Sequence, residues 1–188
     1  RDLRMSRGLG DVYKRQNEQG CYLASKEEQD ALTNVVLAGG KLNRKCVGRD
    51  AKTLLGMIGV TVPDNIRCIT FEGPKEHPLI ATELMMPILG VVRAKDFDDA
   101  VEQAVWLEHG NRHSAHIHSK NVDRITKYAK AIDTAILVKN GPSYAALGFG
   151  GEGFCTFTIA SRTGEGLTSA SSFTKRRRCV MTDSLCIR

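Results

Sequence analysis

Apolar and polar positions alternate regularly from Ser25 onward and predict helices and strands in turn. Ser25 and Glu28 have the spacing of a capping box, and Leu32, Val35 and Val36 follow on one helical face. Asp50 is the expected N-cap of a second helix that stops at Gly59, and Asn121 is the expected cap of another. Acidic residues followed by apolar ones at helical spacing predict one more helix over 96–110.

Strands are predicted between these helices, at 66–73, 88–96, 114–119 and 134–141. Strands that alternate with helices of this length indicate βαβ units, so the predicted class is α/β with a mainly parallel sheet. After residue 140 the pattern changes to a Gly-rich loop and two strands, 156–159 and 171–183, with no helix between them. The last of these strands has no cleanly apolar face, so we expect an exposed edge that pairs with another chain.

The first sixteen residues, 1–16, show neither helical nor strand periodicity and resemble translated sequencing-adapter DNA. We interpret them as a non-native or disordered tail, with a natural flexible tail as the alternative, and expect the natural chain to extend further at this side.

Charge and composition narrow the function classes. The chain has 188 residues, is 41% hydrophobic and carries a net charge of +6. Residues 1–16 contribute +3 and 174–188 contribute +4, which leaves −1 for the body of the chain. A nucleic-acid surface would spread basic residues over a folded face, so nucleic-acid binding is not expected. No apolar run has the length of a membrane helix, and no secretory signal is visible.

The six cysteines form no CxxC pair, which favours free thiols in a reducing compartment over a zinc site. A reactive cysteine needs a lowered pKa and a partner base or helix N-terminus. Cys68 alternates within a strand, Cys155 follows the Gly-rich loop and Cys179 lies on the expected edge strand. We interpret all three as structural and assign no catalytic residue to this chain.

Two further patterns suggest ligands without establishing them. His116 and His118 share one strand face while His113 points away, which makes a poor metal site, so none is predicted. Gly148 to Gly153 matches GxGxxG, but strand-like residues follow where a dinucleotide motif requires a helix. A tight turn or a close approach to a substrate is the preferred interpretation of this loop.

Glu83 is the one carboxylate within the apolar stretch "HPLIATELMMPILGVVR". Burying an unpaired carboxylate costs several kcal/mol, so Glu83 is exposed, paired or present for a ligand. Taken alone, the residues favour a structural Glu that caps a short helix or pairs with Arg93.

Several motifs follow one another along the chain: "ELMMP" followed by "ILGVVRAKDFDDAV", then "LVKNGPSYAALGFGGEGF" and "ASRTGEGLTSASSFTKRRRCV". In this order and spacing they resemble the aldehyde dehydrogenase family over residues 17–188. The last motif, with "HGNRHSAHIHSKNVDRITKYAKAIDTAILVKN", resembles the CoA-acylating branch. The resemblance implies a partial Rossmann-like catalytic domain at 17–160 and a C-terminal segment at 161–188 with an oligomerisation strand.

The resemblance also implies an activity. Intact, such an enzyme oxidises acetaldehyde or propionaldehyde to the acyl-CoA with coenzyme A and NAD, or NADP, through a Cys nucleophile. That cysteine precedes the matched region, so the chain alone is expected to be inactive. The implied setting is cytoplasmic, with a homo-oligomer inside a bacterial microcompartment as an option. The alternatives are a non-acylating dehydrogenase and a scaffold module without chemistry.

The same resemblance assigns roles to individual residues. Glu83 would bind the ribose hydroxyls on the nicotinamide side, Met85 would line the nicotinamide and Pro87 would shape the turn into the next strand. Phe149 would wall the aldehyde pocket, and His113 would lie near the cofactor or CoA path. The basic run 175–178 either binds CoA phosphates or, as we prefer, is a solvated or subunit-facing row.

Overall fold

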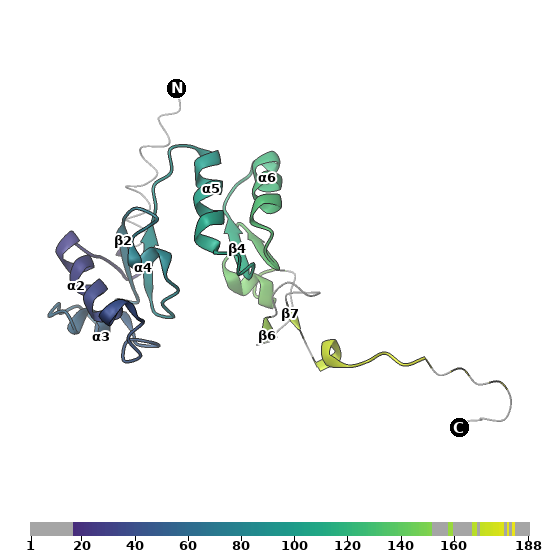
Figure 1. The fold of residues 1–188 in the computed structure, drawn as a ribbon, viewed down its shortest axis with the longest axis horizontal. Coiled ribbons are helices and arrows are strands. Elements are labelled where there is room, and N and C mark those ends of the chain that lie inside the picture. Colours follow the sequence, from purple (N-terminus) through teal and green to yellow (C-terminus); the bar gives the residue numbers. More distant parts are fainter. Residues whose placement is uncertain are drawn as a thin grey trace. The chain divides into compact units, whose positions relative to one another are not determined.

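The computed structural model describes residues 17–151, 158–159, 167–168, 170–178, 180 and 182 (Figure 1). The chain forms two compact units, Arg1–Gln103 and Ala104–Arg188, and the boundary falls within helix α5 (Phe97–Glu108). The predicted tail at 1–16 lies outside the described residues, and the domain limits at 160 and 161 stay a prediction.

The first unit is built around a three-stranded parallel sheet in the order β1-β2-β3. Its elements along the chain are β1 (Cys21–Leu23), α2 (Lys26–Val36), η1 (Ala38–Gly40), α3 (Ala51–Gly56), β2 (Cys68–Glu72), α4 (Pro78–Ala81) and β3 (Ile88–Val91). Helices connect the parallel strands, so the predicted α/β class is confirmed.

Helix starts follow the predicted caps. The Ser25 hydroxyl accepts from the Glu28 amide at 3.3 Å, while the Glu28 carboxylate accepts from the Ser25 amide at 2.7 Å, which completes the capping box. Asp50 accepts from the Thr53 amide at 2.6 Å and starts α3. These side chains satisfy amides that the first helical turn leaves without a backbone acceptor.

One face of the sheet carries the core. Ile69 and Phe71 lie two residues apart on β2, so their side chains share a face, and both are completely buried. Helices α2, α3 and α4 cover this face (Figure 1). The buried cluster consists of Ala24, Leu32, Val36, Cys46, Ala51, Leu54, Leu55, Val62, Ile69, Phe71, Leu79 and Leu84.

The second unit contains a parallel pair, β4 (Ser114–Ile117) and β5 (Ile136–Lys139), joined by α6 (Val122–Ile132). Asn121 caps α6 as predicted, with its side chain accepting from the Arg124 amide at 3.0 Å. The elements after β5 are η2 (Ser143–Leu147), β6 (Thr158–Ile159), β7 (Leu167–Thr168) and η3 (Ala170–Phe173). β6 and β7 are antiparallel, which agrees with the predicted change of pattern after residue 140.

The structure differs from the sequence prediction at three places. β1 and α4 were not predicted, because a three-residue strand and a single helical turn leave almost no periodic signal. The strand predicted at 171–183 is wrong for this chain where the structure describes it, since η3 occupies its start and 175–178 form no ladder. An edge strand forms only against a partner strand. The predicted pairing of this segment with another subunit therefore stays a prediction.

Within the described ranges, no helix is long and apolar enough to span a membrane.

Candidate functional site

The loop at 82–87, which holds Glu83, Met85 and Pro87, connects α4 to β3. Leu84 anchors it in the core at 6% exposure. The Met85 carbonyl accepts from the Gly48 amide at 3.2 Å, and the Pro87 carbonyl accepts from the Ile69 amide at 2.8 Å. The loop is therefore fixed on both sides, and Pro87 lies at the entry to β3, where the sequence predicted a turn.

Glu83 and Met85 face solvent from this loop, on either side of the buried Leu84. Met85 is 68% exposed and has a φ of 52°, the left-handed region that side chains other than Gly rarely adopt. Strained non-Gly residues cluster at ligand sites, where the surrounding contacts hold them in place. Met85 thus presents an exposed apolar side chain from a strained backbone position.

The structural alternative for Glu83 is wrong. Arg93 pairs with Glu72 instead, through two hydrogen bonds of 2.8 and 2.7 Å. The short helix α4 is capped by His77. Within the described part of the chain, nothing donates a hydrogen bond to Glu83 or forms an ion pair with it. The exposed carboxylate is thus available to accept hydrogen bonds from hydroxyl groups, which fits the ribose contact that the resemblance implies.

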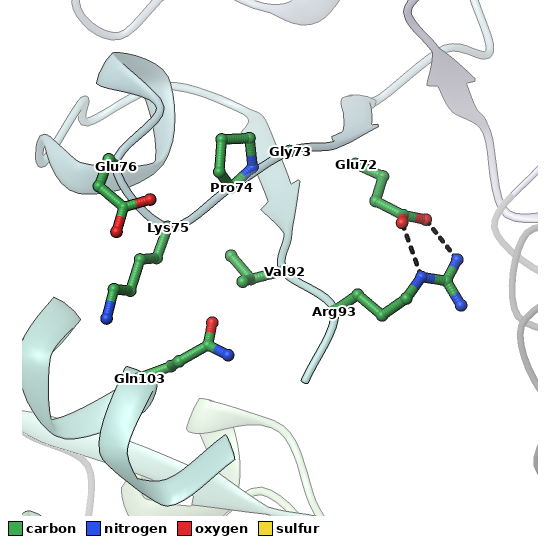
Figure 2. Close-up of a pocket in the computed structure, with 8 residues that line it drawn as sticks. All are labelled: Glu72, Gly73, Pro74, Lys75, Glu76, Val92, Arg93 and Gln103. Atoms are coloured by element: carbon green, nitrogen blue, oxygen red, sulfur yellow. Dashed lines mark hydrogen bonds and ion pairs between the residues drawn. The ribbon is translucent and has the colours of Figure 1, made fainter. Parts of the chain in front are cut away.

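A cavity of about 530 Å³ lies at the other end of the same strands (Figure 2). It opens beyond the carboxyl ends of β2 and β3, a usual place for ligands in parallel sheets. Its lining is Glu72, Gly73, Pro74, Lys75, Glu76, Val92, Arg93 and Gln103. The lining contains no Cys, Ser or Thr, and the predicted site residues lie elsewhere, so the cavity and the 82–87 loop are separate features.

His113 and Phe149 belong to the second unit. His113 is exposed directly before β4, with its Nδ1 2.8 Å from the Ser114 hydroxyl. Phe149 is 65% exposed and packs edge-on against Tyr144, with ring centroids 6.2 Å apart. His113 precedes the strand pair and Phe149 follows it, and the structure records no contact between the two. Both residues therefore lie at the surface, and the structure does not bring them together in one site.

Sequence reasoning missed a polar cluster at the carboxyl ends of β4 and β5. His116 Nε2 lies 2.9 Å from the Ser143 hydroxyl. Asn140 binds Ser119 twice at 2.8 Å, accepting from its amide and donating to its carbonyl. The "NGPS" sequence after a predicted strand was the available signal, because polar turn residues there meet those of the neighbouring parallel strand.

Cys46 and Cys68 lie in surroundings unsuited to nucleophilic catalysis. Burial, reinforced by the neighbouring Cys21 thiol, raises the pKa of Cys68 to about 11. Cys46 is fully buried, with its Sγ 3.7 Å from the Val35 carbonyl. The raised pKa is consistent with a structural Cys68, which stays a prediction, while Cys155 and Cys179 lie outside the described residues. The described residues contain no cluster of three or more His, Cys, Asp or Glu side chains able to hold a metal ion.

The Gly-rich loop turns tightly where it is described. Gly148 ends η2 with a φ of 90°, and a Cβ on Gly151 would lie 2.7 Å from the Ala145 carbonyl oxygen. Only Gly tolerates that approach. The loop follows the short helix η2, whereas the dinucleotide motif follows a strand directly, which argues against a phosphate-binding role. Gly153 lies outside the described residues.

The parallel strands joined by helices define the class of this protein, the α/β proteins with parallel sheets. The aldehyde dehydrogenase family model matches residues 65–172, and the chain belongs to that family. The acetylating acetaldehyde dehydrogenase of Salmonella typhimurium is 50% identical over 77% of this chain and 31% of that protein. The chain thus spans about a third of the length of such relatives.

Solved structures of propionaldehyde dehydrogenases are similar to this chain. A propionaldehyde dehydrogenase from the Clostridium phytofermentans fucose utilisation microcompartment is 82% identical, with a TM-score of 0.83 over 91% of this chain and 39% of that one. A propionaldehyde dehydrogenase from Rhodopseudomonas palustris, solved with bound CoA and an acylated cysteine, is 50% identical. Its TM-score is 0.85 over 92% of this chain and 40% of that one.

Proposed function

We propose that this chain supplies the cofactor-side loop of a CoA-acylating aldehyde dehydrogenase acting on a short aldehyde. The overall reaction is RCHO + CoA-SH + NAD⁺ → RCO-S-CoA + NADH + H⁺. The observation that carries the proposal is the fixed 82–87 loop, with an exposed Glu83 that pairs with no described residue. The acylating names of the relatives and the CoA and acylated cysteine of the Rhodopseudomonas palustris structure support this branch.

In this proposal the residues of the chain bind and orient. Glu83 accepts hydrogen bonds from the ribose hydroxyls on the nicotinamide side, Met85 packs against the nicotinamide, and Phe149 walls the aldehyde pocket. NAD⁺, when bound, serves as the hydride acceptor. The Cys nucleophile precedes this segment in the longer enzyme, so the 188-residue chain alone is inactive. A microcompartment location is proposed on the source of the Clostridium phytofermentans relative.

A chimaera tests this function. In it, residues 17–188 of this chain replace the matching segment of the Clostridium phytofermentans enzyme, which is used unaltered as the control. We expect NADH to form only when propionaldehyde and CoA are both present. NADH formation without CoA would favour a non-acylating dehydrogenase, and a folded chimaera that forms no NADH would rule out the proposal.

A further inference from the structure

His77 is a buried histidine that no proposed catalytic role uses. Its side chain is 8% exposed, and its ring lies against Phe71 of β2 with centroids 4.8 Å apart. Its Nδ1 accepts a hydrogen bond from the Leu79 amide at 3.2 Å. Its carbonyl accepts from the Ile80 and Ala81 amides at 2.8 and 2.9 Å. His77 therefore accepts hydrogen bonds from all three N–H groups of α4, since Pro78 has none.

α4 depends on such support because it contains only four residues, Pro78–Ala81. A single helical turn is unstable by itself, since nucleation costs more than one hydrogen bond returns. Leu79 anchors the turn in the core at 2% exposure. Ile80 lies on Gly90 of β3, where a Cβ would come within 2.2 Å of the Ile80 Cγ1. These contacts place α4 directly over the strand that follows the 82–87 loop.

The loop spans the short distance between these two elements. Thr82 follows the last residue of α4 in an extended conformation, with a ψ of 137°, and β3 begins at Ile88. A shift of α4 on β3 must therefore move the loop between them. The hydrogen bond from the Gly48 amide to the Met85 carbonyl joins this loop to the preceding segment, so it reports the loop's position.

We propose that His77 is a positioning residue: its neutral imidazole, by capping α4, holds Glu83 and Met85 in the conformation that binds the cofactor. The Nδ1 atom can accept the Leu79 hydrogen bond only while it is unprotonated. Protonation therefore removes the cap and releases the loop. This inference rests on the proposed role of Glu83 in cofactor binding.

The surroundings of His77 favour the neutral ring. Burial is the main cause that lowers the pKa of His77. The Lys26 ammonium lowers this pKa further, whereas the Asp30 carboxylate raises it. Lys26 and Asp30 both belong to α2 and pair with each other at 3.2 Å. β2 contributes the apolar Phe71 ring, α4 contributes no ionisable side chain, and Glu76, the preceding residue, is exposed.

Two substitutions in the full chain separate the effect of the His77 hydrogen bond that caps α4 from the effect of its ring packing on Phe71. His77→Phe keeps a ring against Phe71 but loses the acceptor, whereas His77→Asn keeps an acceptor and loses the ring. By hydrogen exchange, we expect the Gly48 amide to exchange about fivefold faster or more in His77→Phe and near the wild-type rate in His77→Asn. In the wild type, the Leu79 and Gly48 amide resonances should shift together below pH 6.5, and His77→Asn should abolish this shift. Unchanged Gly48 exchange in His77→Phe, or no shared shift in the wild type, overturns the proposal.

The chimaera then links the loop to cofactor binding. We expect His77→Phe to raise the KM for NAD⁺ more than it lowers kcat, with rescue by His77→Asn. If Glu83→Gln raises this KM and His77→Phe does not, the positioning proposal is wrong. If neither substitution changes the KM while Gly48 exchange responds to His77→Phe, His77 does position the loop, and the proposed cofactor role of Glu83 is what fails.

Discussion

The Tyr22 hydroxyl donates a hydrogen bond of 2.6 Å to Glu28, the same carboxylate that completes the capping box of α2. Tyr22 lies on β1 and Glu28 in the first turn of α2, so one carboxylate joins the strand to the helix. Glu28 is a strong acceptor because its charge strengthens both hydrogen bonds. This contact explains how a strand of only three residues keeps its place at the edge of the sheet.

We expect Tyr22→Phe to lower the free energy of unfolding by about 1 kcal/mol, the usual net value of a hydrogen bond. The hydrogen bond to Glu28 is the main cause that raises the pKa of Tyr22 to about 12, so the fold favours the neutral phenol. This contribution is complete below pH 10 and is lost as the pH rises toward 12. Urea denaturation of both proteins between pH 7 and 11 measures the effect. Superimposable stability curves would show that the contact contributes nothing, and a constant offset would show that its contribution does not depend on the ionisation of Tyr22.

Gly90→Ala should destabilise the first unit by about 1 to 3 kcal/mol, the range for an overpacked core. The added Cβ would lie 2.2 Å from the Ile80 Cγ1, so either α4 or β3 must move. Gly56→Ala is the matched control, because nothing lies within 4 Å of its added methyl and it is part of a helix. Thermal unfolding should show a lower Tm for Gly90→Ala and an unchanged or higher Tm for Gly56→Ala. Equal Tm values would contradict the packing of Ile80 on Gly90.

Local signals predicted the parts of the fold that local interactions determine. Ser25, Asp50 and Asn121 cap their helices as predicted, because a cap is a contact between residues three apart in sequence. The partner of Arg93 was not predictable in this way. Glu72 lies 21 residues earlier, and only the parallel pairing of β2 with β3 brings the two side chains together.

The candidate site shows the same difference between local sequence signals and tertiary contacts. Sequence resemblance pointed to Glu83, whose role as a cofactor ligand stays a proposal. Its exposure depends on the burial of Leu84 and on the positive φ of Met85, which arise from tertiary contacts. His77 carried no signal either, because histidine is an uncommon N-cap and α4 is too short to show a period. A residue that acts through packing, as we propose for His77, is thus harder to predict than one that belongs to a sequence motif, such as Glu83.

Cys68 should resist alkylation under native conditions. Burial and the Cys21 thiol raise its pKa to about 11, so its thiolate fraction near neutral pH is about two orders of magnitude below that of a free cysteine. We expect iodoacetamide at pH 7.5 to modify Cys68 about 100-fold more slowly in the folded chain than in urea. Mass spectrometry of proteolytic peptides measures both rates. Native modification as fast as that in urea would show that the thiol is neither buried nor perturbed.

Glu83→Gln in the chimaera tests the proposed cofactor contact most directly. The substitution keeps the size of the side chain and removes the charge, so hydrogen bonds from the ribose hydroxyls weaken. We expect the KM for NAD⁺ to rise roughly tenfold, which corresponds to about 1.4 kcal/mol, while the KM for CoA stays within about twofold. Glu102→Gln, which alters an exposed carboxylate on α5, is the matched control and should leave both constants unchanged. An NAD⁺ KM that stays at the control value in Glu83→Gln would mean that the exposed carboxylate of the 82–87 loop has a role other than binding the cofactor.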